Sequence, residues 1–265
     1  MKIDVLLSCM HQRDRKILGR TRIFGDAVVV NQCGISQQET IRTPWGRVTW
    51  LDSDRTGLSR SRNMAIAASD ADVCLLCDDD EVFEPDYRQI IRNAYRLLPK
   101  ADVIVFKIRD RNRLPDRVMP LRFPRTFHVA SWQISFRRER IVAAGVGFDV
   151  LLGAGTGNGA EEELKFLMDC ERKGLRIYYV PRSIARVSHR KSTWFTGFNE
   201  TFFYNRGAST RYILGFPLAA AYGVYYVLRK RRLYCGNLTT RAALRAVFRG
   251  MAENKITKQA RKEEP

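Results

Sequence analysis

The sequence predicts an α/β fold built on a mainly parallel sheet that is flanked by helices. Short apolar runs alternate with helical patterns through the first half of the chain, which is typical of crossover units. The run at residues 73–77 leads directly into four consecutive acids, residues 78–81. An apolar run bounded by polar residues indicates a buried strand, and open α/β sheets bind ligands at the carboxyl ends of such strands. These acids are therefore the first candidates for a functional site.

The elements of the first half follow in a regular order. Strands are expected at residues 3–8, 27–30, 48–51, 73–77 and 103–108, and helices at residues 58–68 and 87–98. Pro85 suits the start of the second helix, because the missing amide hydrogen of proline would be unpaired in a first turn anyway.

The second half of the chain is less regular. Residues 109–125 are charged and predict a long loop, and residues 145–159 are rich in glycine. A strand is expected at residues 131–136 and a helix at residues 161–173. This helix ends before Gly174, because glycine is the usual residue just past a helix end. A last strand at residues 177–180 is expected to end at Pro181.

Composition limits the partners. The chain has 265 residues, with 46 Lys and Arg against 28 Asp and Glu, so its net charge is +18. Such an excess favours a polyanionic partner: nucleic acid, anionic lipid or a phosphorylated substrate. The six cysteines form no regular framework, so free thiols in a reducing compartment are expected. The amino terminus has no signal-peptide pattern, and we expect a cytoplasmic protein.

The acid run has two interpretations. The side chains of Asp78 and Asp80 lie two residues apart, so in extended backbone they point the same way. Two hard oxygen ligands aimed together suit Mg²⁺ or Mn²⁺ that also holds substrate phosphates. The alternative is a solvated acidic turn.

The carboxyl-terminal part differs in character. Residues 212–228 contain no charged side chain, and four basic residues, 229–232, follow at once. The apolar stretch is shorter than the roughly 20 residues of a spanning helix. An apolar segment beside a basic cluster suits the surface of an anionic membrane, and the alternative is a buried core helix. We expect residues 206–265 to be a helical, membrane-associating segment with a basic tail, which would place the protein peripherally on the inner face of the membrane.

Two groups of motifs resemble the family 2 glycosyltransferases of the GT-A fold. The stretch from Gly57 to Ile66, followed by residues 78–81 and Pro85, is similar to the basic helix start and acidic D-x-D motif of that family. The later motifs resemble its acceptor half; they are Phe148-Asp149, Glu161-Glu162-Glu163 up to Gly174, Tyr178-Tyr179-Val180-Pro181, and His189. The resemblance covers residues 3–190, so residues 1–205 are expected to form the glycosyltransferase domain.

The resemblance implies a metal-dependent, inverting transfer of a sugar from a nucleotide-sugar donor. A UDP-sugar is the expected donor, and a glycan or lipid-linked acceptor in cell-surface polysaccharide synthesis is the expected partner, with no nucleic acid. Mn²⁺ or Mg²⁺ would neutralise the diphosphate as the glycosidic bond breaks. The metal ligands implied are Asp78, Asp80 and His189, although a lone histidine is often structural.

The remaining site residues are assigned by type. Arg60, Arg62 and Asn63 near a helix start would bind the donor, since guanidinium groups and free backbone amides favour phosphate; a solvated helix face is the alternative. Asp79, together with Glu81, would orient ligands or the sugar. Trp132 would face an acceptor sugar, or else lie in the core.

The reaction also needs a base for the acceptor hydroxyl. By the spacing to Gly174, Glu162 and Glu163 fall at the Glu-Asp pair of the family, which makes Glu163 the base and Glu162 its neighbour, while Glu161 stays open.

The family carries an acid that contacts the nucleotide base at the end of the second strand, where this chain has Asn31. An asparagine amide can also form hydrogen bonds with the edge of a nucleotide base, so Asn31 is the expected contact to the nucleotide base of the donor.

Two other functions remain as alternatives. A nucleotidyltransferase would also use carboxylate-bound metal, but it requires a phosphate loop rich in lysine and glycine after the first strand, and residues 8–12 do not supply one. A non-enzymatic protein that binds membranes or nucleic acid would be explained by the basic charge alone.

Overall fold

The computed structural model describes residues 1–109, 114–158, 161–187 and 197–263. The chain divides into two compact units. Unit 1 comprises residues 1–148 and 163–190, and unit 2 comprises residues 149–162 and 191–265. The boundary expected between residues 205 and 206 lies inside helix α6 (Glu200–Leu214).

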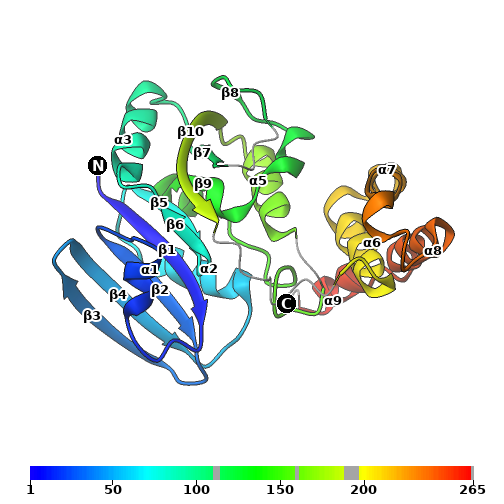
Figure 1. Ribbon diagram of the computed structural model, residues 1–265, viewed down its shortest axis with the longest axis horizontal. Coiled ribbons are helices and arrows are strands. Elements are labelled where there is room, and N and C mark those ends of the chain that lie inside the picture. Colours follow the sequence, from blue (N-terminus) through cyan, green and yellow to red (C-terminus); the bar gives the residue numbers. More distant parts are fainter. Residues whose placement is uncertain (110–113, 159–160, 188–196, 264–265) are drawn as a thin grey trace. The chain divides into compact units, whose positions relative to one another are not determined.

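A mixed sheet forms the centre of unit 1 (Figure 1). Among the described residues its strands are β1 (Ile3–Met10), β2 (Ala27–Gln32), β3 (Gln37–Thr43), β4 (Gly46–Ser53), β5 (Val73–Asp78), β6 (Glu81–Phe83), β7 (Val103–Ile108), β8 (Met119–Pro120), β9 (Ile134–Arg137) and β10 (Ile177–Val187). Their order is β3-β4-β2-β1-β5-β9-β7-β10-β6, with β8 paired to β10. The neighbours β4, β2, β1 and β5 run parallel, as do β7 and β10. The predicted α/β class with a parallel centre is confirmed.

Helices cover both faces of this sheet. They are α1 (Lys16–Arg20), α2 (Leu58–Ala68), α3 (Tyr87–Leu97), α4 (Arg138–Ala143) and α5 (Glu162–Arg172). The core under α1 and α3 contains Val29, and the core under α2, α4 and α5 contains Val28 and Val30. Because successive side chains of a strand point to opposite faces, a continuous run of valines fills both cores. This explains why the central strands appear in the sequence as unbroken apolar runs.

Two predicted strands need correction, and an edge strand was not predicted. Strand β10 does not end at Pro181 but continues to Val187, with register shifts on either side of Ser183. Proline lacks an amide hydrogen and is tolerated at such an irregularity. Residues 131–133 form a 3-10 helix, and β9 begins only at Ile134. The edge strand β3 was not expected, because its largely exposed residues are mostly polar.

Unit 2 is helical, with α6, α7 (Phe216–Tyr234), α8 (Thr240–Glu253) and α9 (Lys255–Glu263). Two glycines bring α6 and α8 close together: a Cβ on Gly207 would lie 2.0 Å from the carbonyl oxygen of Val247, and one on Gly250 would lie 2.0 Å from that of Tyr204. The apolar stretch at 212–228 is not continuous, because Gly215, with φ of +76°, separates α6 from α7. No helix within the described ranges is long and apolar enough to cross a membrane.

Candidate active site

The parallel register brings polar residues to one edge of the sheet in unit 1. Asn31 on β2 pairs with Cys9 on β1 and with Asp52 on β4. Asp78, the last residue of β5, pairs with Ser8. The carboxyl ends of parallel strands meet at this edge, where α/β sheets bind ligands. The acid run therefore lies at the expected place.

The backbone at the acid run differs from the extended form that was expected. Asp78 ends β5, but Asp79 and Asp80 form a turn, and Glu81 begins β6. The alternation of side chains in a strand therefore does not describe how Asp78 and Asp80 are oriented. Asp79 is exposed, Asp80 is half-buried, and Glu81 is buried. Burial and the nearby Asp78 raise the pKa of Glu81 well above its ordinary value.

Side-chain hydrogen bonds attach the start of α2 to this edge. The backbone amide of Gly57 donates to Oε1 of Gln32 at 2.7 Å, and Oγ of Ser61 donates to Oγ of Ser8 at 2.9 Å. These contacts join the first turns of α2 to the ends of β2 and β1. They fix the position from which Arg62 extends towards Asp78.

Arg62 is the central cation of the described site. Its side chain is 1% exposed, and Nη2 lies 3.0 Å from Oδ1 of Asp78. Nη1 lies 3.6 Å from Oε1 of Glu163 at the start of α5. The guanidinium also lies over the ring of Phe148, 5.2 Å from its centroid. A buried charge requires such compensation, and the rigid fork of arginine suits two carboxylates.

The three consecutive glutamates have different surroundings. Glu161, with φ of +89°, forms an ion pair with Arg206 and accepts a hydrogen bond of 3.0 Å from Ser209, both within unit 2. Glu162 is buried. Glu163 shares Arg62 with Asp78. Its role as the base stays a prediction.

Asn31 and Asp52 form a pair that sequence reasoning did not recognise. Nδ2 of Asn31 donates to Oδ1 of Asp52 at 2.7 Å, and the same oxygen accepts from Nε1 of Trp50 at 2.9 Å. The amide of Asn31 also exchanges two hydrogen bonds with the backbone of Gln12. Burial would raise the pKa of Asp52, but the bonds from Trp50 and Asn31 outweigh it, so the pKa is lowered. Asp52 is thus a carboxylate at the place where Asn31 was expected to act.

Asn63 positions a loop of unit 1. Its Nδ2 donates to the carbonyl oxygen of Phe148 at 2.7 Å, and its Oδ1 accepts from the amide of Phe148 at 2.8 Å. The ring of Phe148 in turn stacks on Phe166 with centroids 4.4 Å apart. Both polar ends of Asn63 are engaged in this way, and its role in donor binding stays a prediction.

The remaining candidates lie around the same edge or outside the described residues. Arg60 is half-buried in the first turn of α2. Oγ of Ser131, which the sequence did not single out, donates to Oδ2 of Asp78 at 2.7 Å. Trp132, beside it, is half-buried and packs partly against the core. His189 falls outside the described residues.

The acids fit a metal held jointly with a substrate, not one held by protein alone. Over the described ranges, no group of three or more His, Cys, Asp or Glu side chains could hold a metal ion. Mg²⁺ commonly uses one or two carboxylates and completes its shell with phosphates and water. Asp78 is partly exposed; its Oδ2 accepts from both Ser131 and Arg62, whereas its Oδ1 accepts one bond from Arg62 and keeps a further lone pair. Asp78 with Asp80 therefore fits the limited ligand set of such an ion.

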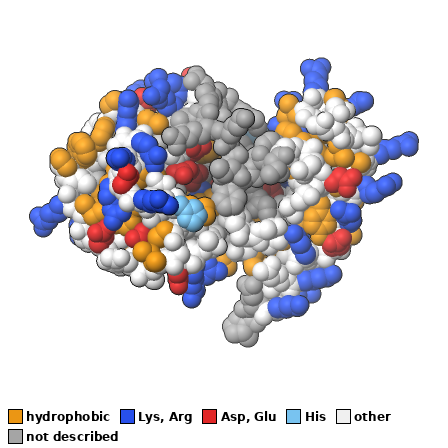
Figure 2. Space-filling model, turned by 60° about the horizontal axis from the view of Figure 1, so that its bottom comes forward, with side chains coloured by type: hydrophobic (Ala, Val, Ile, Leu, Met, Phe, Trp, Pro, Cys, Tyr) orange, Lys and Arg blue, Asp and Glu red, His pale blue; other side chains and the backbone are white. Residues whose placement is uncertain are grey.

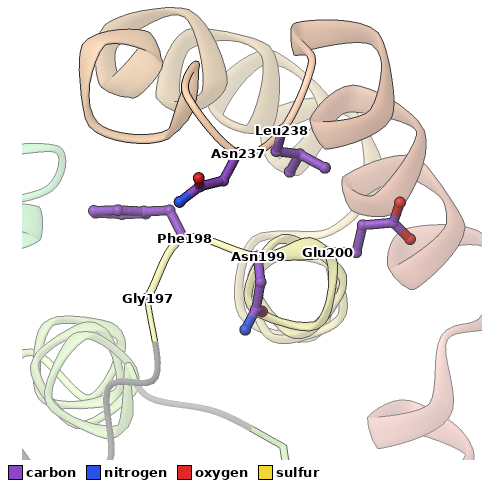
Figure 3. A pocket seen from close by; sticks show the side chains of 6 residues that line it. All are labelled: Gly197, Phe198, Asn199, Glu200, Asn237 and Leu238. Carbon is purple, nitrogen blue, oxygen red and sulfur yellow. The ribbon is translucent and has the colours of Figure 1, made fainter.

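Unit 2 has a separate pocket of about 350 Å³ at the start of α6. Figure 3 shows its lining, which consists of Gly197, Phe198, Asn199, Glu200, Asn237 and Leu238. The side chain of Asn199 accepts a hydrogen bond from the amide of Phe202, so it caps the helix. That contact gives Asn199 a structural role, and we assign no chemistry to this pocket.

Comparisons with known proteins agree with the geometry of unit 1. Residues 37–150 match the sequence model of glycosyl transferase family 2. The crystal structure of S. aureus TarS 1-349 in complex with UDP-GlcNAc has a TM-score of 0.59 at 16% identity, and the match covers 89% of this chain and 74% of that chain. The complex of TarS 1-349 with UDP has a TM-score of 0.57 at 13% identity, covering 97% and 83%. No curated protein sequence matches the chain.

The two kinds of match carry different information. At these identities the TarS structures show that the fold is shared. The matched residues 37–150 include Asp52, Arg62 and the acid run, whereas Glu163 lies beyond them. The sequence match over residues 37–150 and the shared fold together support a family 2 glycosyltransferase of the GT-A fold.

Proposed function

We propose that this protein transfers a sugar from a UDP-sugar to a hydroxyl group of a glycan or lipid-linked acceptor, with inversion at the anomeric carbon. The observation that carries the proposal is the position of Arg62 between Asp78 and Glu163 at the carboxyl edge of the sheet. That edge thereby combines a cation, a carboxylate suited to metal and a carboxylate suited to proton transfer. The bound UDP-GlcNAc and UDP of the TarS structures support a uridine nucleotide as the leaving group.

The reaction would be a single displacement. The acceptor oxygen attacks the anomeric carbon, the bond from that carbon to the diphosphate breaks, and the diphosphate leaves with the electron pair. Glu163 takes the proton of the acceptor hydroxyl in the same step. Attack by one acceptor on the face opposite the leaving group inverts the anomeric centre.

Charge compensation would fall to Arg62 and to a divalent cation. Arg62 holds Asp78 in place and supplies positive charge beside the leaving diphosphate. Asp78 and Asp80 would hold Mn²⁺ or Mg²⁺, and His189 remains a proposed third ligand. When bound, such an ion acts as a Lewis acid that stabilises the charge on the diphosphate.

The acceptor side is proposed from the residues near Asp78. Trp132 follows Ser131, which is bonded to Asp78, so its ring would lie near the reacting sugar and would offer an aromatic face. We infer that the acceptor belongs to cell-surface polysaccharide synthesis and that the protein works peripherally at the cytoplasmic face of a membrane. The basic charge of +18 supports contact with anionic lipid.

The test is a panel of UDP and UDP-sugars, with and without Mn²⁺, followed by thermal unfolding. A ligand at about a hundred times its Kd stabilises the native state by about 2.7 kcal/mol. We expect stabilisation by one UDP-sugar, dependent on the metal, and release of UDP once an acceptor is present. Asp80→Ala should abolish both effects, whereas the exposed Asp86→Ala should retain them.

Two outcomes would contradict the proposal. Full transfer by Asp80→Ala would remove the metal assignment. Release of pyrophosphate in place of UDP would identify a nucleotidyltransferase.

A further inference from the structure

One side of helix α7 in unit 2 exposes an unusual number of apolar residues. Between residues 217 and 228, the solvent-facing positions are Pro217, Leu218, Ala221, Val224, Tyr225 and Leu228. Leu218, Tyr225 and Leu228 are 53%, 57% and 55% exposed. Their spacing repeats every three or four residues, which places them along one face over about 18 Å of helix. We call these six residues the α7 face.

The opposite side of α7 already has its partner. Ala219, Gly223 and Val227 are buried in the core of unit 2. A Cβ on Gly223 would lie 2.8 Å from side-chain atoms of Val247 and Met251, so α7 packs closely on α8 there. The α7 face is therefore not needed for the packing of this unit.

The charge around the α7 face is strongly positive. Its last turn continues into Arg229, Arg231 and Arg232, which are all exposed. From Phe216 to Glu253 the chain has seven Arg or Lys residues and a single acid, Glu253, whose carboxylate accepts a hydrogen bond from Tyr204. Figure 2 shows Lys and Arg side chains projecting from this unit between exposed apolar ones.

We propose that the α7 face is the surface by which the protein lies on an anionic phospholipid bilayer. An interfacial helix buries an apolar face at the boundary between headgroups and acyl chains and keeps its basic residues at the phosphates. The α7 face supplies aliphatic side chains for the first requirement, and the three exposed arginines supply the second. Tyr225 suits the interfacial depth, because its ring is apolar and its hydroxyl is polar.

Charge complementarity favours an anionic bilayer over a second copy of the chain as the partner of the α7 face. A second copy of the chain docked on the same face would bring one arginine cluster towards another copy that is equally basic. An anionic bilayer offers negative charge over its whole surface, and each basic residue near it strengthens binding about fivefold. The inference refines the membrane location proposed above and rests on that proposal for its purpose, but lipid binding needs neither donor nor acceptor. An experiment can therefore contradict the lipid-binding proposal without contradicting the proposed sugar transfer, and the reverse is also true.

The experiment is co-sedimentation of the full chain with vesicles of phosphatidylcholine, with and without phosphatidylglycerol. We expect binding to the anionic vesicles alone, weakened by salt. The triple variant Leu218→Ser, Tyr225→Ser, Leu228→Ser removes apolar surface at constant charge, and the triple variant Arg229→Gln, Arg231→Gln, Arg232→Gln removes charge at constant apolar surface. Each should weaken binding about a hundredfold.

Two matched controls test the location. Arg241→Gln, Arg245→Gln, Arg249→Gln removes the same charge from α8 and should weaken binding less than about tenfold. Leu97→Ser removes an apolar side chain that is 79% exposed on α3 and should have no effect. Equal losses from the α7 and α8 arginine variants would overturn the proposal in favour of diffuse attraction.

A second measurement does not depend on the serine variant being folded. Tyr225→Trp should show a blue-shifted emission and quenching by brominated lipid in the anionic vesicles, relative to the unmodified chain. Leu97→Trp should show neither. No quenching at position 225, or a dimer in sedimentation that the serine variant converts to monomer without any vesicle binding, would overturn the proposal.

Discussion

Nη2 of Arg62 lies 3.0 Å from Oδ1 of Asp78, and the arginine side chain is 1% exposed. The same guanidinium approaches Glu163 on a helix that begins about a hundred residues later in the chain. The candidate metal ligand and the candidate base are thus held against one cation. This contact makes the fold of unit 1 and its proposed chemistry depend on the same side chain.

Arg62→Met should destabilise unit 1 and abolish transfer. The apolar replacement fills similar space but leaves two carboxylates near each other without a cation. Breaking a buried pair by removing one partner costs about 3 kcal/mol or more, and the partial exposure of Asp78 places the expected loss at the lower end. Urea unfolding measures this loss.

Arg96→Met, at an exposed position of α3, is the matched control and should change stability by less than about 0.5 kcal/mol. Arg62→Lys keeps the charge without the fork, and it should recover stability better than activity. Equal stability of the Arg62→Met and Arg96→Met variants would contradict the structural role of the pair.

Glu163→Gln should lower kcat by about 10²–10⁴ while the affinity for UDP is unchanged, because the amide cannot take the proton of the acceptor. The comparison is Glu161→Gln, which alters the ion pair with Arg206 in unit 2. That variant should lose stability and retain most of kcat. Steady-state kinetics with calorimetric UDP binding separates the two effects. If kcat falls in Glu161→Gln and persists in Glu163→Gln, the base is Glu161, two residues before the position assigned to it.

Asp52→Asn should weaken UDP binding about tenfold or more. Asp52 is a carboxylate of lowered pKa at the edge of the sheet, so it is ionised at neutral pH and can accept a hydrogen bond from an N–H group of a nucleotide base. A hydrogen bond to a charged group contributes about 1.5–3 kcal/mol. Asp54→Asn removes an exposed acid two residues away and should leave the Kd unchanged. Identical affinities for the two variants, measured by calorimetry, would show that Asp52 does not contact the base.

The parallel centre of the sheet was predictable because buried strands leave a strong local signal. Runs such as the one around Val29 are apolar on both faces, and nothing but a sheet covered on two sides buries them all. Helix α2 was predicted with its observed bounds, Leu58–Ala68. Strand β3 was not, since an edge strand with exposed polar side chains has no such pattern.

The site was predictable only to the level of residue types at strand ends. Asp52 follows the strand expected at residues 48–51, so the rule that identified Asp78 would have found it as well. The hydrogen bond from Ser131 to Asp78 joins residues 53 positions apart, and no local pattern encodes it. The turn at Asp79 and Asp80 matches the second interpretation of the acid run, an acidic turn; the sequence did not decide between the two interpretations, because four acids in a row contain no glycine or proline to mark a turn.

Asp4 and Asp70 should shift the pH dependence of stability in opposite directions. Burial raises the pKa of Asp4 above its ordinary 3.8, so its contribution is complete below pH 3.8 and is lost as pH rises through the folded pKa. Asp4→Asn removes this loss, and its stability relative to the unmodified chain should be higher at pH 8 than at pH 4.

Hydrogen bonds from Lys2 and Arg47 lower the pKa of Asp70 to about 2. The stability that Asp70 contributes is therefore complete above pH 3.8 and is lost as pH falls through its folded pKa of about 2. Asp70→Asn should therefore be less stable than the unmodified chain at pH 7, by a small margin because the pair is exposed, and the difference should close on acidification. Urea unfolding at several pH values measures both, and a shift of the two variants in the same direction would contradict the assigned causes.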